Sequence, residues 1–394
     1  MPRAVLAIAG VGVAWLLVWQ LLVTPWRDPN RLRLPPQQQV STAVPILGVH
    51  TRLTDEVEQS KIRRTLEMVR RMGAQWDVEY FPWNYVQRHG VGEWDWTHAD
   101  LVVDHAQRQG LKLIARLDSV PVWARPRDTA YSYLDPSHYA DFGNFVYQFV
   151  RRYRGKVAAY VIWNEPNVSY EWGVRPPDPE AYAQLLKVAY QRAKQADSQA
   201  VVLAAPLAPT LEKSNLALDD LDYLDRLYDA GAAPYFDGLA AHTYGWRNPP
   251  DQAPSAGAVN LRRVELLRQV MVRHGDGGKM VYVTETGWND YPRWIRAVSP
   301  SQRTDYTVEA VRLAQSWPWL AAFCIWEFRL PTVTHTYNDA WYLVRTDFSP
   351  TPVYLALRRL AAGNASVKVK REEKPSVGQA SSLSGAEGPA NWAA

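Results

Sequence analysis

The sequence predicts an α/β fold, a (β/α)8 barrel that spans residues 44–363. The first observation is an alternation of short apolar runs with amphipathic stretches of helical period, which is the pattern of parallel βα units. The second is their number, because eight such units match the TIM barrel, whose active sites lie at the carboxyl ends of the strands. A doubly wound open sheet is the alternative, but no glycine-rich phosphate-binding turn supports it.

The first four units combine short apolar strands with clear helix-start signals. Their strands are expected at 46–50, 75–80, 111–117 and 160–163. The helix after the first strand, about 55–72, has apolar residues at spacings of four and three on one face, and Gly73 ends it. The second helix starts near Thr97. The third and fourth follow Asp135 and Asp178, each an N-cap residue before a proline.

The last four units repeat this pattern. Their strands are expected at 201–205, 239–244, 280–284 and 321–326. Helices are expected near 218–229 and 261–273, and another begins at Ser299, where Gln302 completes a capping box. The final helix follows Thr351 and a proline.

Residues 1–26 contain an uncharged apolar run, Val5 to Val23, which is long enough to cross a bilayer. Arg3 precedes it, as in the charged start of an export signal, and no A-x-A-like cleavage site follows. An uncleaved signal-anchor is therefore expected, with a membrane as partner and the main domain outside the cytoplasm. A cleaved signal peptide and secretion is the alternative, and a buried helix of the main domain is a third interpretation.

Two further segments have the composition of unstructured chain. Residues 27–43 are rich in proline and glutamine, which is typical of a linker. Residues 364–394 hold a charged cluster followed by Ser, Gly, Ala and Pro, so they bury too little apolar surface to fold and are expected to be disordered.

Composition and motif searches exclude several classes of function. The formal net charge is only +4 without an extended basic stripe, so nucleic acid is not an expected partner. The single cysteine, Cys324, lies in an apolar strand and is expected to be a buried thiol. The eight histidines show no H-x-x-x-H or H-E-x-x-H spacing, so no metal is expected, and no G-x-S-x-G elbow is present.

Two glutamates follow strands in segments that suit sugar chemistry. Glu165 lies in the segment W-N-E-P-N, residues 163–167, and Glu285 lies in T-E-T-G-W, residues 284–288. Each ends a short apolar run, so each is expected at the carboxyl end of a strand. Two carboxyl groups are the minimal equipment for glycoside hydrolysis with retention, in which one protonates the leaving oxygen and the other attacks the anomeric carbon. This mechanism needs no cofactor.

The two motifs, in this order, resemble the retaining glycosidases of clan A, nearest families 39 and 5. The resemblance implies that Glu165 is the acid/base at strand four and that Glu285 is the nucleophile at strand seven. It also implies that Asn164 holds the sugar 2-hydroxyl. His242 and Tyr244 would border the nucleophile, with the tyrosine hydroxyl orienting it.

Aromatic residues after the strands are the expected sugar-stacking surfaces. Trp326 would form the floor under the reacting sugar, and Trp123 and Trp288 are candidates for subsite walls, although core packing suits these two equally. Many family 5 enzymes carry an arginine near the end of strand two. This chain has none there, so Arg116 in strand three is a candidate replacement and the family 39 neighbourhood is favoured.

The sequence therefore predicts a retaining O-glycosidase that acts on poly- or oligosaccharides, with β-linked substrates suggested by the resemblance. A non-catalytic glycan-binding barrel and a transglycosylase that uses the same glutamates are the alternatives. The sugar, the linkage, the choice between internal and terminal cleavage, and the oligomeric state are not determined by the sequence.

Overall fold

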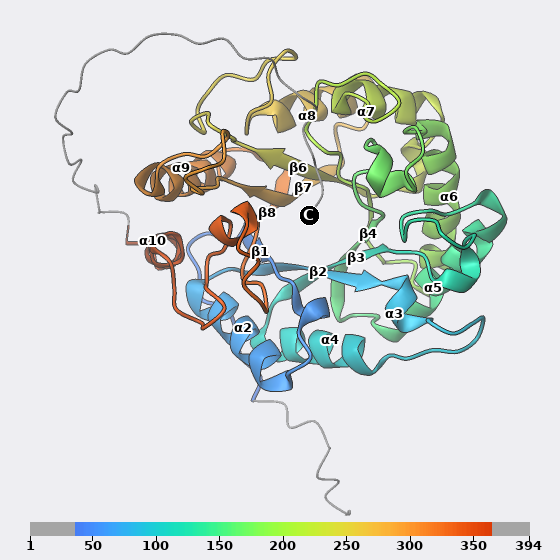
Figure 1. Cartoon of the computed structure of the whole chain (residues 1–394), viewed down its shortest axis with the longest axis horizontal. Helices are drawn as coiled ribbons and strands as arrows, with labels where there is room; N and C mark the ends of the chain where they lie inside the picture. The colour runs from blue at the N-terminus through green and yellow to red at the C-terminus, as the bar shows by residue number, and fades with distance from the viewer. Residues whose placement is uncertain (1–35, 365–394) are drawn as a thin grey trace, which may run out of the picture. The chain divides into compact units, whose positions relative to one another are not determined.

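The computed structural model describes residues 36–364 and has eight parallel strands closed into a barrel in chain order (Figure 1). β1 pairs with β2 on one side and with β8 on the other, which closes the sheet. The strands are β1 Leu47–His50, β2 Trp76–Pro82, β3 Lys112–Asp118, β4 Val157–Ile162, β5 Val202–Ala204, β6 Gly238–Tyr244, β7 Met280–Gly287 and β8 Leu320–Ile325. All eight predicted strands are confirmed, although β4 begins three residues before its predicted start.

Helices surround the barrel on its outer side (Figure 1). They are α2 Gln59–Met72, α3 Trp83–Val86, α4 Thr97–Gln109, α5 Tyr139–Arg152, α6 Pro179–Ala196, α7 Asp220–Asp229, α8 Arg263–Arg273, α9 Pro300–Ala314 and α10 Pro352–Ala361. Short 3-10 turns occur at Leu53–Asp55, Val122–Ala124, Pro136–His138, Ser169–Trp172, Ala233–Tyr235 and Tyr337–Ala340.

The predicted helix caps at Asp178, Ser299 and Thr351 are confirmed, whereas α4 begins at Thr97 without a side-chain cap. The Asp178 side chain accepts a hydrogen bond from the Ala181 amide, and the Ser299 capping box with Gln302 is complete. Asp135, in contrast, makes no cap hydrogen bond, because the residues after it form a 3-10 turn and α5 begins only at Tyr139. The capping signals thus place the helix starts to within a few residues.

The barrel interior is filled by small and branched side chains, and β1 lies very close to its neighbours. A Cβ atom on Gly48 would lie 2.5 Å from Cys324 Sγ and 2.8 Å from Trp76 Cβ, so only glycine fits there. Cys324 is fully buried, as predicted, and burial raises the pKa of its thiol. The interior is therefore a packed core, and chemistry is confined to the ends of the strands.

The predicted membrane anchor and the predicted disordered tail lie outside the described residues. Among the helices between residues 36 and 364, none is long and apolar enough to span a membrane. The described part of the predicted linker, residues 36–43, is bonded to the barrel. The Gln38 amide donates to the Arg108 carbonyl and the Ala43 amide to the Ala361 carbonyl. Composition does not reveal such backbone pairing.

Candidate active site

Both predicted catalytic glutamates lie at the carboxyl end of the barrel. Glu285 is inside β7 and only 7% exposed, while Glu165 follows β4 by three residues and is partly exposed. Trp163 and Glu165 adopt positive φ angles of 78° and 37°, which non-glycine residues rarely do. Two bonds hold this turn. The buried Trp163 indole donates to the Glu171 carbonyl (2.8 Å), and the Glu165 amide donates to the Pro206 carbonyl (3.0 Å).

A single histidine connects the two glutamates. His242 Nδ1 lies 2.7 Å from a carboxyl oxygen of Glu165, and Nε2 of the same ring lies 3.4 Å from a carboxyl oxygen of Glu285. His242 is 2% exposed, so its ring is held rigidly between them. The two carboxyl groups therefore belong to one site, on opposite sides of one imidazole.

Glu285 has the larger set of polar partners. The Tyr244 hydroxyl donates to one carboxyl oxygen at 2.7 Å, and Arg116 Nη1 lies 3.5 Å from the other. Burial raises the pKa of Glu285, and the charge of Glu165 adds to the rise. His242, Arg116 and the Tyr244 hydrogen bond oppose it. The site thus desolvates this carboxyl and surrounds it with donors that favour its ionised form.

Arg116 of β3 lies beside Glu285, as expected of a replacement for the arginine that many family 5 enzymes carry near the end of strand two. Its Nη1 donates to Asn164 Oδ1 at 3.2 Å while facing Glu285, and its Nε lies 3.2 Å from Asp118. The guanidinium also lies over the Tyr80 ring, 4.6 Å from its centroid. A fixed positive charge beside the nucleophile candidate is therefore supplied by β3.

An open cleft of about 610 Å³ lies over these groups. Its lining includes Asn164, Glu165, Tyr244, Glu285 and Trp326, all predicted site residues. The Trp326 ring meets the His50 ring edge-on, with 4.8 Å between the two ring centroids. The other aromatic residues of the cleft are Tyr80, Tyr85, Tyr131, Tyr170, Trp246, Trp294, Tyr337 and Trp341.

The structure does not place Trp123 and Trp288 in the cleft. The Trp123 indole donates to the Gln87 carbonyl, and its ring contacts Trp83 edge-on at 5.3 Å. Trp288 is 2% exposed and packs so closely that a Cβ atom on Gly245 would lie 2.0 Å from its ring. Both side chains pack against other parts of the protein, which is the second role that the sequence allowed for them.

Five charged residues of the cleft were not identified from the sequence, and two of them are Asp118 and Arg296. Burial raises the pKa of Glu171 and of Glu327 to about 8. Arg52, which follows β1, is the fifth. Glu327 directly follows the predicted site residue Trp326, so its position in the sequence could have identified it. No motif marks Glu171 in its loop after β4.

The loop after β5 is fixed by the last residue of the W-N-E-P-N segment. The Asn167 side-chain amide donates to the carbonyls of Ala208 (2.9 Å) and Leu218 (3.0 Å), and its oxygen accepts from the Ala208 amide (2.8 Å). Asn167 is fully buried and Ala208 lines the cleft. The W-N-E-P-N segment, which contains the acid/base candidate Glu165, therefore also fixes the neighbouring wall of the cleft.

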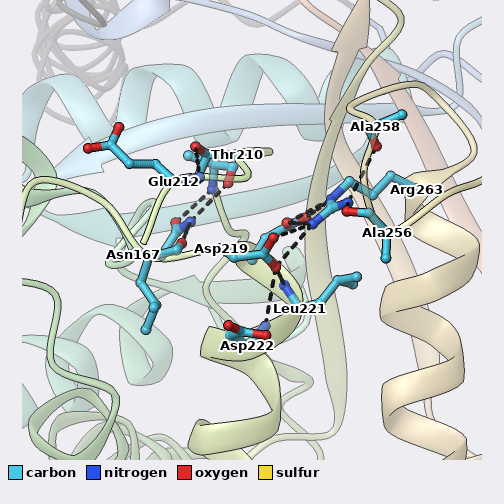
Figure 2. Close-up of polar contacts among 12 residues, drawn as sticks. Asn167, Thr210, Glu212, Asp219, Leu221, Asp222, Ala256, Ala258 and Arg263 are labelled. Atoms are coloured by element: carbon cyan, nitrogen blue, oxygen red, sulfur yellow. Dashed lines mark hydrogen bonds and ion pairs between the residues drawn. The ribbon is translucent and has the colours of Figure 1, made fainter. Parts of the chain in front are cut away.

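A buried arginine fixes the next loop (Figure 2). Arg263 is 1% exposed and pairs with Asp219 and Asp220 at the start of α7. Its Nη1 also donates to the Ala256 carbonyl (2.9 Å) and more weakly to that of Ala258 (3.3 Å). Asp219 in turn caps α7. This network ties the loop between β6 and α8 to the helix that follows β5.

Solved structures similar to this chain are glycoside hydrolases. A family 39 glycoside hydrolase from the gut symbiont Bacteroides cellulosilyticus WH2 is 20% identical, with a TM-score of 0.65 over 84% of this chain and 65% of that chain. A monomeric β-xylosidase from Caulobacter crescentus CB15 is 19% identical, with a TM-score of 0.60 over 83% and 70% of the two chains. A GH5_18 protein from Streptomyces cattleya, solved in complex with Manβ1-4GlcNAc, is 12% identical, with a TM-score of 0.64 over 83% and 82%.

The predicted resemblance to the TIM-barrel glycosidases of families 39 and 5 is confirmed by these structures. At such identities the likeness establishes the shared fold. The chain spans 65% of the length of the first of these proteins. No protein-family model and no curated protein matches the sequence.

Proposed function

We propose that the chain is a retaining O-glycosidase that cleaves β-linked poly- or oligosaccharides through Glu165 and Glu285. The observation that carries this proposal is the single His242 ring that contacts both carboxyl groups at 2.7 and 3.4 Å under an open cleft. A fold shared with glycoside hydrolases adds support.

The first half of the reaction joins the sugar to the protein. The Glu285 carboxylate attacks the anomeric carbon, the bond from that carbon to the leaving oxygen breaks, and Glu165 gives its proton to that oxygen. The Tyr244 and Arg116 contacts suit Glu285 to this role, because they favour its ionised form despite burial. Asn164, held by Arg116, is placed to meet the sugar 2-hydroxyl.

The second half releases the sugar. Glu165 removes a proton from water, the water oxygen bonds to the anomeric carbon, and the bond to Glu285 breaks. Two inversions at the same carbon give net retention. The proposal predicts that the two carboxyl groups lie at the retaining separation of roughly 5 to 5.5 Å, and not at the roughly 6.5 to 9.5 Å of inverting enzymes.

The proposed substrate is a carbohydrate stacked on Trp326. The solved relatives include a β-xylosidase and an exo-β-1,4-mannosidase, which supports β-linked substrates for this chain. We also propose that the domain acts outside the cytoplasm, on the strength of the Val5–Val23 run alone. A transglycosylase would use the same residues and pass the glycosyl group to a sugar in place of water.

The stereochemistry of the first product tests the proposal. Full-length protein would be given 4-nitrophenyl β-glycosides of xylose, glucose and mannose, and the reaction followed by proton NMR. We expect the β-anomer of one sugar to appear first and to mutarotate later. First appearance of the α-anomer would contradict retention. A double variant that carries Glu165→Gln and Glu285→Gln is the comparison. If it released nitrophenol as fast as the wild type, this result would contradict glycosidase activity and favour a glycan-binding barrel.

A further inference from the structure

The strongest unexplained feature of the cleft is the side chain of Glu327. It is 2% exposed, it lines the cleft directly after Trp326, and within residues 36–364 neither of its carboxyl oxygens makes a hydrogen bond. A buried carboxyl group without partners is costly, and native proteins rarely leave one so. The two-glutamate mechanism gives this residue no task.

Arg52, on the same side of the cleft, has a hydrogen-bond donor without a partner among residues 36–364. Its Nη2 atom donates to Asp55 at 2.8 Å, while its buried Nε atom has no hydrogen-bond partner in the described part of the chain. Its guanidinium lies 6.0 Å from the centroid of the Trp326 ring. The floor expected under the sugar is thus flanked by an unused acceptor and an unused donor.

Arg52 and Glu327 influence each other without touching. Each charge favours the ionised form of the other, yet no hydrogen bond or ion pair joins the two side chains in the described structure. A group that both accepts and donates hydrogen bonds would satisfy the two residues together. A sugar hydroxyl does both.

We propose that Glu327 and Arg52 form a hydroxyl-binding clamp that recognises two adjacent hydroxyl groups of a neutral pyranose stacked on Trp326. The proposal rests on the proposed function and specifies its substrate. The 2-hydroxyl is expected at Asn164, so the adjacent pair left on a pyranoside is at positions 3 and 4. Arg52 N–H donates to one of these hydroxyls, and Glu327 accepts from the other.

The charges of the cleft favour a neutral ligand over a charged one. Burial raises the pKa of Glu171 and of Glu327 to about 8, so both carry little charge at neutral pH. The other carboxyl groups of the lining, those of Asp118, Glu165 and Glu285, equal in number the arginines at 52, 116 and 296, so neither sign of charge predominates. An amino group on the sugar would face Arg52. Glu327, whose pKa burial raises to about 8, offers little negative charge at neutral pH to compensate. Hydroxyl groups match both residues in either protonation state of Glu327.

Deoxygenated substrates combined with substitutions test the clamp. For full-length protein acting on 4-nitrophenyl β-D-xylopyranoside, we expect the 3-deoxy and 4-deoxy analogues each to lower kcat/KM by about 100-fold, because they leave a buried group unpaired. Glu327→Leu should lower kcat/KM for the parent by a similar factor, yet change that for one of the deoxy analogues less than about threefold. Arg52→Met should do the same with the other analogue. Glu327→Gln, which keeps an acceptor, should retain most of the parent rate.

Equal losses on the parent and on both analogues would overturn the clamp, since a structural role alone predicts them. Thermal unfolding of each variant identifies misfolded protein. Where a variant unfolds, binding of methyl β-D-xylopyranoside and its two deoxy analogues to the wild type decides the matter, because the clamp requires both analogues to bind more weakly.

The two proposals fail separately. If the wild type binds the xyloside through Glu327 but hydrolyses no glycoside, the glycosidase proposal fails and the clamp stands. If it hydrolyses the parent and both analogues equally well, the clamp fails and the glycosidase proposal stands.

Discussion

At the scale of single residues, the site depends on groups that hold Glu285 ionised although it is buried. The Tyr244 hydrogen bond of 2.7 Å is the shortest of these contacts. It lowers the pKa of Glu285, whereas burial raises it. Hydrogen bonds to charged groups contribute about 1.5–3 kcal/mol, so a single hydroxyl has a measurable effect on the reaction.

Tyr244→Phe should lower kcat/KM by about 10-fold to 100-fold and shift the acid limb of its pH profile to higher pH. The sign follows from the lost donor, because without it the pKa of Glu285 rises and the nucleophile is protonated over a wider range. A pH series with an aryl glycoside measures both effects. Tyr282→Phe, on the neighbouring strand β7 and packed against the barrel core, is the control. An unchanged acid limb in Tyr244→Phe would contradict the role.

The candidate catalytic residues were predictable because they lie at the ends of strands in short motifs. Glu165, Glu285, His242 and Tyr244 were identified this way, and the structure brings them together. Glu171 was not identified, because it lies in a loop after β4 and reaches the cleft through the fold of that loop. The sequence left two roles open for Trp288, since aromatic character alone does not separate packing from ligand contact.

At the scale of elements, the loops after β5 and β6 depend on Arg263. This guanidinium neutralises Asp219 and Asp220, which are 5% and 1% exposed. Removing one partner of a buried ion pair leaves an uncompensated charge, which typically costs about 3–5 kcal/mol. The neighbouring Arg262 pairs with Glu265 nearer the surface, where such pairs contribute roughly 0–1 kcal/mol.

Arg263→Met should therefore lower the free energy of unfolding by about 3–5 kcal/mol, measured by urea denaturation. Arg262→Met should change it by less than about 1 kcal/mol. Similar values for the two variants would show that the buried network does not hold the loops.

The strands and helix starts were predicted well because they depend on local patterns. Apolar runs and capping residues such as Ser299 determine the structure of residues only a few positions away along the chain. The Arg263 network joins residues 44 positions apart, such as Arg263 and Asp219, and no local pattern reveals it. The backbone pairing of residues 36–43 was not predicted for the same reason, because its partners lie on distant helices.

At the scale of the whole molecule, the buried carboxyl groups make stability depend on pH. The pKa of Glu327 is about 8 in the folded protein, above its ordinary value of 4.5. The folded state thus holds this proton more tightly, and its ionisation costs stability progressively as pH rises from about 4.5 to about 8. Full ionisation costs on the order of several kcal/mol.

Glu327→Gln should become more stable relative to the wild type as pH rises from 5 to 8, measured by urea denaturation at each pH. The exposed Glu309→Gln, on α9, should keep a constant difference over this range. A constant difference for Glu327→Gln as well would contradict the raised pKa.

The apolar run Val5–Val23 leads to a prediction about the whole chain in a cell. We expect the full-length protein to fractionate with membranes and its mature N-terminus to retain Arg3, because no cleavage signature follows the run. N-terminal sequencing measures this, and a start near residues 25–30 would indicate a cleaved signal.

The assignment of Glu285 as nucleophile and Glu165 as acid/base is tested most directly by azide rescue of the two alanine variants. Glu285→Ala removes the nucleophile, so added azide should restore reaction on an aryl β-glycoside and give the inverted α-glycosyl azide. Glu165→Ala keeps the nucleophile, so azide should attack the glycosyl-enzyme and give the retained β-glycosyl azide. Opposite stereochemistry in the two variants would reverse the roles, and wild-type rates without azide in both would contradict the two-glutamate mechanism.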